Sequence, residues 1–337
     1  MHILICSPES NSATGNWVTA TRYTHALERF SHRISQCYLP PDKEVLAEIV
    51  QQSQPDLLLL IHAYRSGWQF IQARHKINLP IVVMLSGTDV NEGLVDARQA
   101  IIIEQVMTYA DALLSHNLLQ IAQLQHSHPQ LAQRLHYIPP AIELGHAPYP
   151  LRQRHHFSDD VLVFLCPASV RRVKGLLELV ELFDLLPADS SRWQLAFCGP
   201  VLDDEYARQF FIVIEQRSWA HYLGVIDHEA MPAALRQADV VLNNSFSEGL
   251  PNALIEAAVI GLPILARDIV GNRPVVDHGV NGLLYHDSVS FVAMADKLIN
   301  DSTLRQRLAN PRPEHYTLAA EDLALNKVCE LVAAEFG

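Results

Sequence analysis

The 337-residue sequence has no apolar run that approaches the roughly 20 residues needed to cross a bilayer, so we expect no transmembrane segment. The opening MHILICSPES has neither a basic region nor a long apolar core, which argues against a signal peptide. Low-complexity stretches and short-period repeats are also missing. With 49% hydrophobic and 18% charged residues, the composition predicts a soluble, well-packed globular protein. The scattered cysteines described below are those expected of a protein of the cytoplasm.

Positive charge is scarce as well. The sequence holds 25 Lys and Arg against 37 Asp and Glu, a formal net charge of −12. Nucleic acid and anionic membranes are therefore poor partners, and a phosphate-bearing ligand would need a local cluster of cations. No CxxC pair occurs, and no cysteine lies at metal-ligand spacing from a histidine, so we expect reduced structural thiols. The cysteines are Cys6, Cys37, Cys166, Cys198 and Cys329.

Short apolar runs alternate with helical patterns along the whole chain. Runs at 2–6, 56–61 and 81–85 are continuous, which is typical of parallel strands with both faces covered. The pattern restarts at 161–168, after a stretch rich in Pro, His and Arg at 141–160 that we interpret as an interdomain linker. The sequence therefore predicts an α/β protein of two Rossmann-like doubly wound domains facing across a cleft. The expected division is 1–150, 151–312 and a C-terminal helix within 313–337.

Residues 247–263, SEGLPNALIEAAVIGLP, combine a polar turn with a short apolar helix. The turn follows the strand expected at 239–244. Pro251 suits the first helical position, and Gly261 with Pro263 ends the helix. A helix that starts where a parallel strand ends directs its N–H groups and dipole at the ligand edge of the sheet, where they favour an anion. The residues expected to hold that anion are Gly249, Leu250, Pro251 and Asn252.

Two glutamates flank the start of this helix. Glu248 lies in the turn, and Glu256 is one helical turn beyond Asn252 on the same face. A nucleotide sugar suits this layout, because its phosphates would accept from the N–H groups while its hydroxyls donate to the two carboxylates. Two alternatives stay open at this point. Residues 245–248 also match a capping box, and Glu256 would then be an ordinary exposed helix residue.

The densest positive cluster of the second half is VRRVKG at 170–175, which follows the strand at 161–168. Arg171 and Lys174 would lie at the carboxyl end of a parallel strand, where phosphate contacts are expected. The alternative interpretation is the solvated start of a helix.

Together these segments resemble the family 4 retaining glycosyltransferases of the GT-B fold. The resemblance covers nearly the whole chain. It rests on NNSFSEGLPNALIEAAVIGLPILARDIVGN (243–272), VVDHGVNGLLYHD (275–287), WQLAFCGP (193–200) and the Arg-x-x-Lys of VRRVKG. Three N-terminal segments are similar to the subgroup of glycosyltransferase-1-domain-containing proteins and, more distantly, to selenosugar synthases. They are TGNWVTATRY (14–23), LIHAYRSG (60–67) and LSGTDVNE (85–92).

The resemblance assigns roles to single residues. It implies that Glu248 contacts the donor sugar, that Glu256 binds the ribose, and that Arg171 and Lys174 hold the diphosphate and stabilise the leaving group. It also implies donor binding by Gly15 and Asn16, and a last helix that packs back on the first domain.

The acceptor side departs from the family pattern. Many members carry His-Gly after the strand at 81–85, where this chain has Ser86-Gly87-Thr88-Asp89. His62, Arg65 and Asp89 are the candidates for an acceptor pocket. His62 could equally be a satisfied histidine at a strand end, and Asp89 could cap the next helix.

The expected reaction is transfer of a hexosyl group from a nucleoside-diphosphate sugar to an unidentified acceptor, with retention at the anomeric carbon. No DxD motif lies in a suitable loop, so we expect no metal, and no cofactor besides the nucleotide sugar as co-substrate. The acidic charge favours a soluble acceptor. The alternatives are transfer to selenophosphate, nucleotide-sugar epimerisation and a non-catalytic nucleotide-sugar binding module. The donor base and the oligomeric state are not specified by the sequence.

Overall fold

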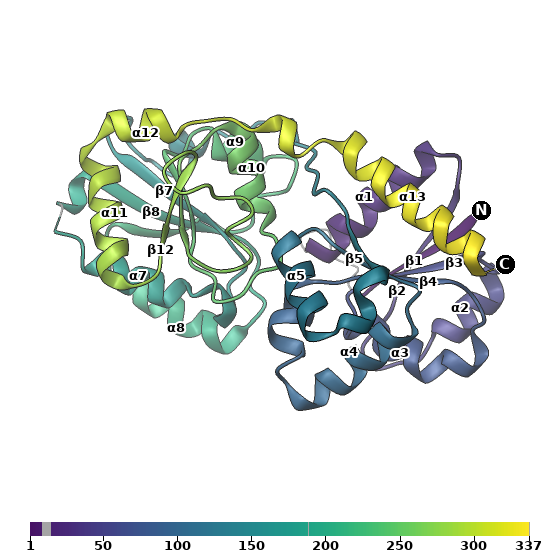
Figure 1. The fold of residues 1–337 in the computed structure, drawn as a ribbon. Helices are drawn as coiled ribbons and strands as arrows, with labels where there is room; N and C mark the ends of the chain where they lie inside the picture. Colours follow the sequence, from purple (N-terminus) through teal and green to yellow (C-terminus); the bar gives the residue numbers. More distant parts are fainter. Residues whose placement is uncertain (9–14, 188, 337) are drawn as a thin grey trace. The chain divides into compact units, whose positions relative to one another are not determined.

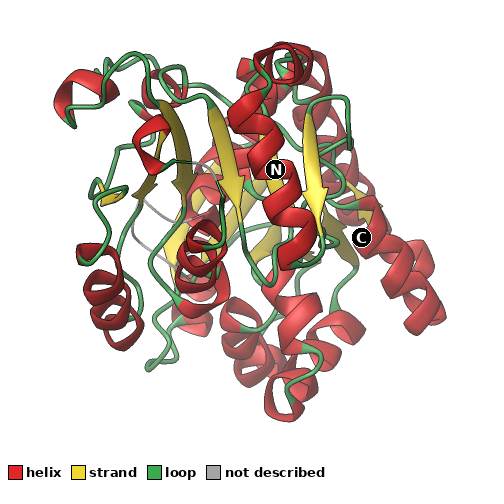
Figure 2. Cartoon of the chain, turned by 90° about the vertical axis from the view of Figure 1, so that its left-hand side faces the viewer, coloured by secondary structure: helices red, strands yellow, loops and turns green. Residues whose placement is uncertain are grey.

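The computed structural model describes residues 1–8, 15–187 and 189–336. The chain forms two compact units. Unit 1 comprises Met1–Ala141 and Thr317–Gly337, and unit 2 comprises Ile142–Tyr316. Each unit contains one parallel sheet of six strands (Figure 1). Helices flank the strands (Figure 2), as a sheet with two apolar faces requires.

The sheet of unit 1 has the order β2-β1-β3-β4-β5-β6. Helices α1 and α13 cover one face, and α2 to α5 cover the other. The strands are β1 (His2–Ser7), β2 (Arg33–Tyr38), β3 (Leu57–Ile61), β4 (Ile81–Met84), β5 (Ala112–Ser115) and β6 (Leu135–Tyr137). The helices are α1 (Gly15–Arg29), α2 (Leu46–Ser53), α3 (Arg65–Ala73), η1 (Arg74–Lys76), η2 (Asp89–Gly93), α4 (Ala97–Tyr109), α5 (Leu118–Ser127), η3 (Pro129–Arg134) and α13 (Leu318–Phe336).

The sheet of unit 2 has the order β12-β11-β10-β7-β8-β9. Helices α7, α8, α11 and α12 cover one face, and α6, α9 and α10 cover the other. The strands are β7 (Leu162–Pro167), β8 (Trp193–Cys198), β9 (Ala220–Tyr222), β10 (Val240–Asn243), β11 (Ile264–Arg267) and β12 (Gly282–Tyr285). The helices are α6 (Leu151–Arg154), η4 (Arg172–Lys174), α7 (Leu176–Asp184), η5 (Ser190–Arg192), α8 (Asp204–Glu215), α9 (Met231–Leu235), α10 (Asn252–Ile260), α11 (Ser288–Asn300), α12 (Ser302–Leu308) and η6 (Pro313–His315).

The strand β2 has no counterpart among the strands expected from apolar runs. It lies at the edge of its sheet and pairs in parallel with β1, with Cys37 opposite Cys6. Its sequence, RISQCY, contains the polar residues Arg33, Ser35 and Gln36, and no residue of this edge strand is fully buried. All five cysteines are free thiols.

The stretch at 141–160 is not a free linker. The chain passes between units at Ala141–Ile142 and again at Tyr316–Thr317, whereas the sequence placed the divisions after 150 and 312. Four apolar side chains of the stretch are buried in the core of unit 2, namely Ile142, Tyr149, Leu151 and Phe157. Their spacing is irregular, so periodicity alone did not reveal that they pack.

The last helix, α13, packs along α1 in unit 1 (Figure 1). Two Arg–carboxylate pairs fix this contact. Arg22 of α1 donates from Nε and Nη2 to the two carboxylate oxygens of Glu321, at 2.5 and 2.9 Å, and both side chains are buried. Arg29 makes the same bidentate contact with Asp322, at 2.7 and 2.9 Å, but is 46% exposed.

Among the described residues, no helix is both long and apolar enough to span a bilayer.

Replacing Arg22 with Met should lower the free energy of unfolding by about 3–5 kcal/mol, because it leaves the buried Glu321 carboxylate without its partner. The matched change Arg29→Met, in the same pair of helices but at an arginine that is 46% exposed, should cost less, about 1 kcal/mol, because solvent reaches the charge of this pair. Urea denaturation of both variants measures the difference. Equal losses would show that burial does not set the strength of the α13 contact.

Candidate functional site

Two loops of unit 2 meet at the carboxyl ends of β7 and β10, which are neighbouring parallel strands. Lys174 lies in the loop after β7, and Glu248 lies in the loop after β10. Lys174 Nζ donates to Glu248 Oε1 at 2.5 Å. Sequence order separates the two residues, and the sheet order brings them together.

Three side chains converge on the same oxygen of Glu248. Besides Lys174, Ser245 Oγ donates to Oε1 at 2.6 Å and Asn243 Nδ2 donates at 3.2 Å. Burial opposes ionisation of Glu248, but the charge of Lys174 and these hydrogen bonds outweigh it and hold the pKa below its ordinary value. Glu248 is therefore a carboxylate at neutral pH.

The side chain of Asn244 connects the loop that holds Lys174 to strands β11 and β12. Its Nδ2 donates to the carbonyl oxygen of Gly175, and its Oδ1 accepts from Arg267 Nη2 at 2.8 Å and from the Tyr285 hydroxyl. Gly175 has a φ of +60°, and a Cβ there would lie 2.6 Å from the Asn244 carbonyl oxygen. Glycine is therefore required for the Lys174 loop to approach β10 this closely.

The loop after β11 packs against Glu248 from another side. A Cβ on Gly271 would lie 2.4 Å from the Glu248 carbonyl oxygen. Asn272 is buried and donates from Nδ2 to the Arg267 carbonyl oxygen and to Asn243 Oδ1, at 2.9 and 3.2 Å. Loops from three strands thus fix the position of Glu248.

The helix α10 begins at Asn252, with Pro251 at its N-cap and no side-chain cap. The capping-box alternative is therefore wrong, because Ser245 lies well before the helix and bonds the Glu248 side chain instead. The N-terminus of α10 keeps the partial positive charge expected of an uncapped helix. Leu250 and Gly249 lie in the turn directly before it.

Glu256 is buried on α10 with 4% of its surface exposed, so the alternative of an ordinary exposed residue is also wrong. Its carboxylate lies 3.4 Å from Nδ1 of His228, which belongs to the loop after β9. Burial raises the pKa of Glu256 to about 8. Glu248 and Glu256 are therefore in opposite protonation states near neutral pH.

The two arginines of VRRVKG, Arg171 and Arg172, differ in how far they are exposed. Arg171 is half-buried, and its Nε is a buried atom without a hydrogen-bond partner among the described residues. An unpartnered buried guanidinium nitrogen is unusual and points to an anionic ligand. Arg172 is exposed and lies over the Tyr206 ring at 5.7 Å.

In unit 1, His62 and Asp89 form a buried pair at the carboxyl ends of β3 and β4. His62 Nδ1 lies 2.7 Å from Asp89 Oδ1, and its Nε2 lies 3.2 Å from the Thr88 hydroxyl. Asp89 accepts from the backbone N–H groups of Ala63, Tyr64 and Ser86, at 2.8 to 2.9 Å. It does not cap α4, whose N-cap is Asp96.

Burial disfavours the charge of Asp89, but His62 and the backbone donors outweigh it and lower the pKa of this carboxyl group. His62 also has a φ of +79°, which is a strained conformation for a non-glycine residue. The pair therefore holds the two loops in a fixed shape.

Arg65, at the start of α3, is exposed. Gly15 and Asn16 are the first residues of α1, and Thr14 of the predicted segment lies outside the described residues.

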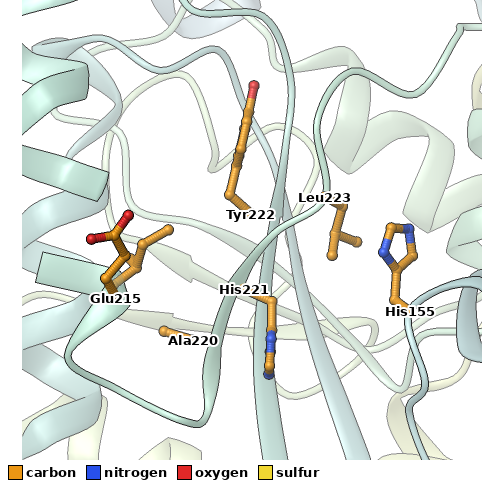
Figure 3. A pocket seen from close by; sticks show the side chains of 7 residues that line it. His155, Glu215, Ala220, His221, Tyr222 and Leu223 are labelled. Atoms are coloured by element: carbon orange, nitrogen blue, oxygen red, sulfur yellow. The ribbon is translucent and has the colours of Figure 1, made fainter. Parts of the chain in front are cut away.

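A hollow of about 260 Å³ lies at the edge strand β9 (Figure 3). Two of its polar side chains already have partners, since His155 bonds the Tyr149 hydroxyl and His221 bonds Gln194. Within the described part of the chain, no group of three His, Cys, Asp or Glu is placed to hold a metal ion. None of the site residues expected from the sequence lines this hollow, and its lining is His155, Ile214, Glu215, Ala220, His221, Tyr222 and Leu223.

Comparison with known proteins finds similarity to glycosyltransferases in sequence and in fold. Residues 150–314, which lie within unit 2, match the family model described as "Glycosyl transferases group 1". The chain is 24% identical over 308 residues to "Glycosyltransferase 1 domain-containing protein 1" of Xenopus tropicalis, covering 88% of this chain and 87% of that protein. It is 28% identical over 227 residues to "D-inositol 3-phosphate glycosyltransferase" of Xylanimonas cellulosilytica, covering 61% and 52%.

Solved structures resemble the chain over almost its full length. Sucrose-phosphate synthase of Thermosynechococcus elongatus has a TM-score of 0.83 at 17% identity, with 99% of both chains covered. The Anabaena protein Alr3699/HepE, solved in complex with UDP-glucose, has a TM-score of 0.79 at 15% identity, with 99% of this chain and 100% of that chain covered. The protein therefore has the GT-B fold, built from two parallel-sheet α/β domains.

Several residues of this cluster were not predicted as site residues. Asn243, Asn244 and Arg267 stand within the segment that carries the family resemblance, yet their residue types alone do not reveal which loops they join. His228 lies in a polar loop with no distinguishing pattern. Only the sheet order and the side-chain contacts identify these residues.

Replacing Glu256 with Gln should make the protein relatively more stable as the pH rises. The folded chain keeps the Glu256 proton up to about pH 8, whereas the unfolded chain releases it near the ordinary pKa of 4.5, so wild-type stability falls across this window. Between pH 5.5 and 8.5 the variant should gain about 1–3 kcal/mol over wild type, since each pKa unit is worth about 1.4 kcal/mol. Urea denaturation at both pH values measures this.

The matched control is Glu104→Gln on α4, an exposed glutamate whose replacement should shift stability equally at both pH values. A Glu256→Gln effect that is the same at pH 5.5 and 8.5 would contradict a buried, protonated Glu256.

Proposed function

We propose that this protein is a family 4 retaining glycosyltransferase, which moves a hexosyl group from a nucleoside-diphosphate sugar to an acceptor. The observation that carries the proposal is the convergence of Lys174, Glu248 and the uncapped N-terminus of α10 at one edge of the second sheet. A cation and a helix N-terminus suit a diphosphate, and a fixed carboxylate suits a sugar hydroxyl.

The comparisons support the same reaction class. The matching family model covers the part of the chain that holds Lys174, Glu248 and Glu256. The Anabaena structure of the same fold was solved with UDP-glucose, and relatives in sequence are named as glycosyltransferases. A nucleotide sugar is therefore the proposed donor, with no choice of base implied.

The donor diphosphate would lie at the N-terminus of α10, within reach of Arg171 and Lys174. Negative charge grows on the diphosphate as the glycosidic bond breaks, and fixed positive groups stabilise that charge more than they stabilise the ground state. Because these cations come from the chain itself, we propose that transfer needs no metal. Lys174 would then divide its contacts between the diphosphate and Glu248, whose carboxylate accepts from the sugar.

On unit 1, His62 and Asp89 would act as positioning residues for the acceptor. Both are buried, and both ring nitrogens of His62 already have partners, so neither is placed to exchange a proton with an acceptor. Arg65 is the exposed candidate for direct contact. The net charge of −12 favours an acceptor in solution over an anionic lipid.

The change Glu248→Gln should reduce glycosyl transfer by at least about 100-fold, because it removes the charge that the sugar hydroxyls meet in the transition state. The assay follows release of nucleoside diphosphate from UDP-, GDP- and ADP-sugars with a panel of acceptors. Full activity of this variant would contradict the assignment. Glu104→Gln, at an exposed position on α4, is the control and should leave the rate unchanged.

The same donor panel separates the alternatives. An isomerised sugar nucleotide formed without an acceptor would indicate an epimerase, and turnover only with selenophosphate would indicate a selenosugar synthase. Binding of a nucleotide sugar without any turnover would indicate a binding module. Retention is read from the anomeric coupling constant of the first product by proton NMR, and an inverted product would contradict the proposed stereochemistry.

A further inference from the structure

The carboxylate of Glu256 has an unusual setting. It is buried on α10, and the one ion-pair partner that the described residues offer it is Nδ1 of His228, at 3.4 Å. The His228 side chain is 36% exposed, so a charge on its ring would be hydrated, whereas a charge on Glu256 would be enclosed by protein. The pair therefore joins an interior acid to a base that reaches solvent.

The other titratable groups near Glu256 are not placed to exchange a proton with it. The Cys198 thiol interacts with Glu256, but burial raises the pKa of this thiol far above neutral pH, so it cannot accept a proton. Of the elements packed against α10, β11 carries Arg267, which bonds Asn244, and η6 carries Glu314 and His315, which pair with each other and are largely exposed.

The loop around His228 adds two further acids, Asp227 and Glu229, whose carboxylates have the same sign of charge as an ionised Glu256. Helix α9, MPAAL, has no titratable side chain. Among the described neighbours, His228 is thus the group placed to exchange a proton with Glu256.

We propose that His228 takes up the proton of Glu256 when the two hydroxyls of a ribose bind the carboxylate, so that a nucleotide binds without net release of a proton. This inference rests on the proposed function and on a donor ribose that lies at Glu256, as the family resemblance implies. The proton leaves an oxygen of Glu256 and bonds to Nδ1 of His228, and no other reactant is needed. His228 acts through Glu256 and is a positioning residue.

Glu256 needs a proton acceptor because its free and ligand-bound forms differ by one proton. Burial raises the pKa of Glu256 to about 8, so the free site holds a protonated acid at pH 7. A diol that donates two hydrogen bonds favours the carboxylate form, which accepts at both oxygens and has no proton of its own to place. Transfer to His228 supplies that form and leaves an imidazolium beside the carboxylate, and the total charge of the pair does not change.

The test is isothermal titration of the full chain with UDP, GDP and ADP, in two pH 7 buffers of different ionisation enthalpy. The buffer dependence of the heat gives the number of protons released. Wild type should release almost none, and His228→Gln should release about one proton per nucleotide bound. The affinity of His228→Gln should also fall about tenfold for each pH unit below 7, a steeper fall than in wild type.

Two controls isolate the pair. His75→Gln, at an exposed histidine of η1, should match wild type in proton release and affinity. The 2′,3′-dideoxy form of the nucleotide that binds best lacks the diol, so wild type and His228→Gln should release equal numbers of protons with it. A purely structural role for His228 would lower affinity but leave the proton count unchanged.

The outcomes are distinct. Equal proton release by wild type and His228→Gln, with a nucleotide bound to both, overturns this inference and leaves the proposed function standing. Failure of all three nucleotides to bind wild type overturns both.

Discussion

The ion pair between Lys174 and Glu248 is the interaction on which the site depends. It joins loops from neighbouring strands β7 and β10, and the two residues lie 74 positions apart in the chain. The pair forms because Gly175 lets one loop approach the Asn244 backbone, and because Asn244 holds that loop by its carbonyl oxygen. The contact is therefore a property of the sheet order, since a different order of strands would separate the two loops.

The two glutamates of the site owe their different states to their surroundings. Glu248 and Glu256 are both buried, yet Lys174 and two hydrogen-bond donors keep Glu248 ionised, while the ion-pair partner that the described residues give Glu256 is the half-exposed His228. One carboxylate is thus fixed and charged before any ligand arrives. The other changes state with its ligand, which makes the histidine beside it part of the binding event.

The sequence predicted the parts of the fold that depend on continuous apolar runs. Most buried strands appear as expected, because a strand covered on both faces admits few polar residues. The short helix expected to start at Pro251 is present as α10, which begins one residue later with Pro251 at its N-cap. The edge strand β2 was missed, since it is half solvated. The stretch at 141–160 was misread because its buried side chains follow no period. Site residues within a motif were predictable, but His228 was not, since its role comes from a contact between the loop after β9 and α10 that no local pattern encodes.

The most direct test of the account is a crystal structure of the protein with the nucleoside diphosphate that binds most tightly. We expect a diphosphate at the N-terminus of α10, in contact with Lys174 and Arg171, and ribose hydroxyls within hydrogen-bond distance of Glu256. A diphosphate bound away from α10, with Lys174 making no contact to it, would contradict the account.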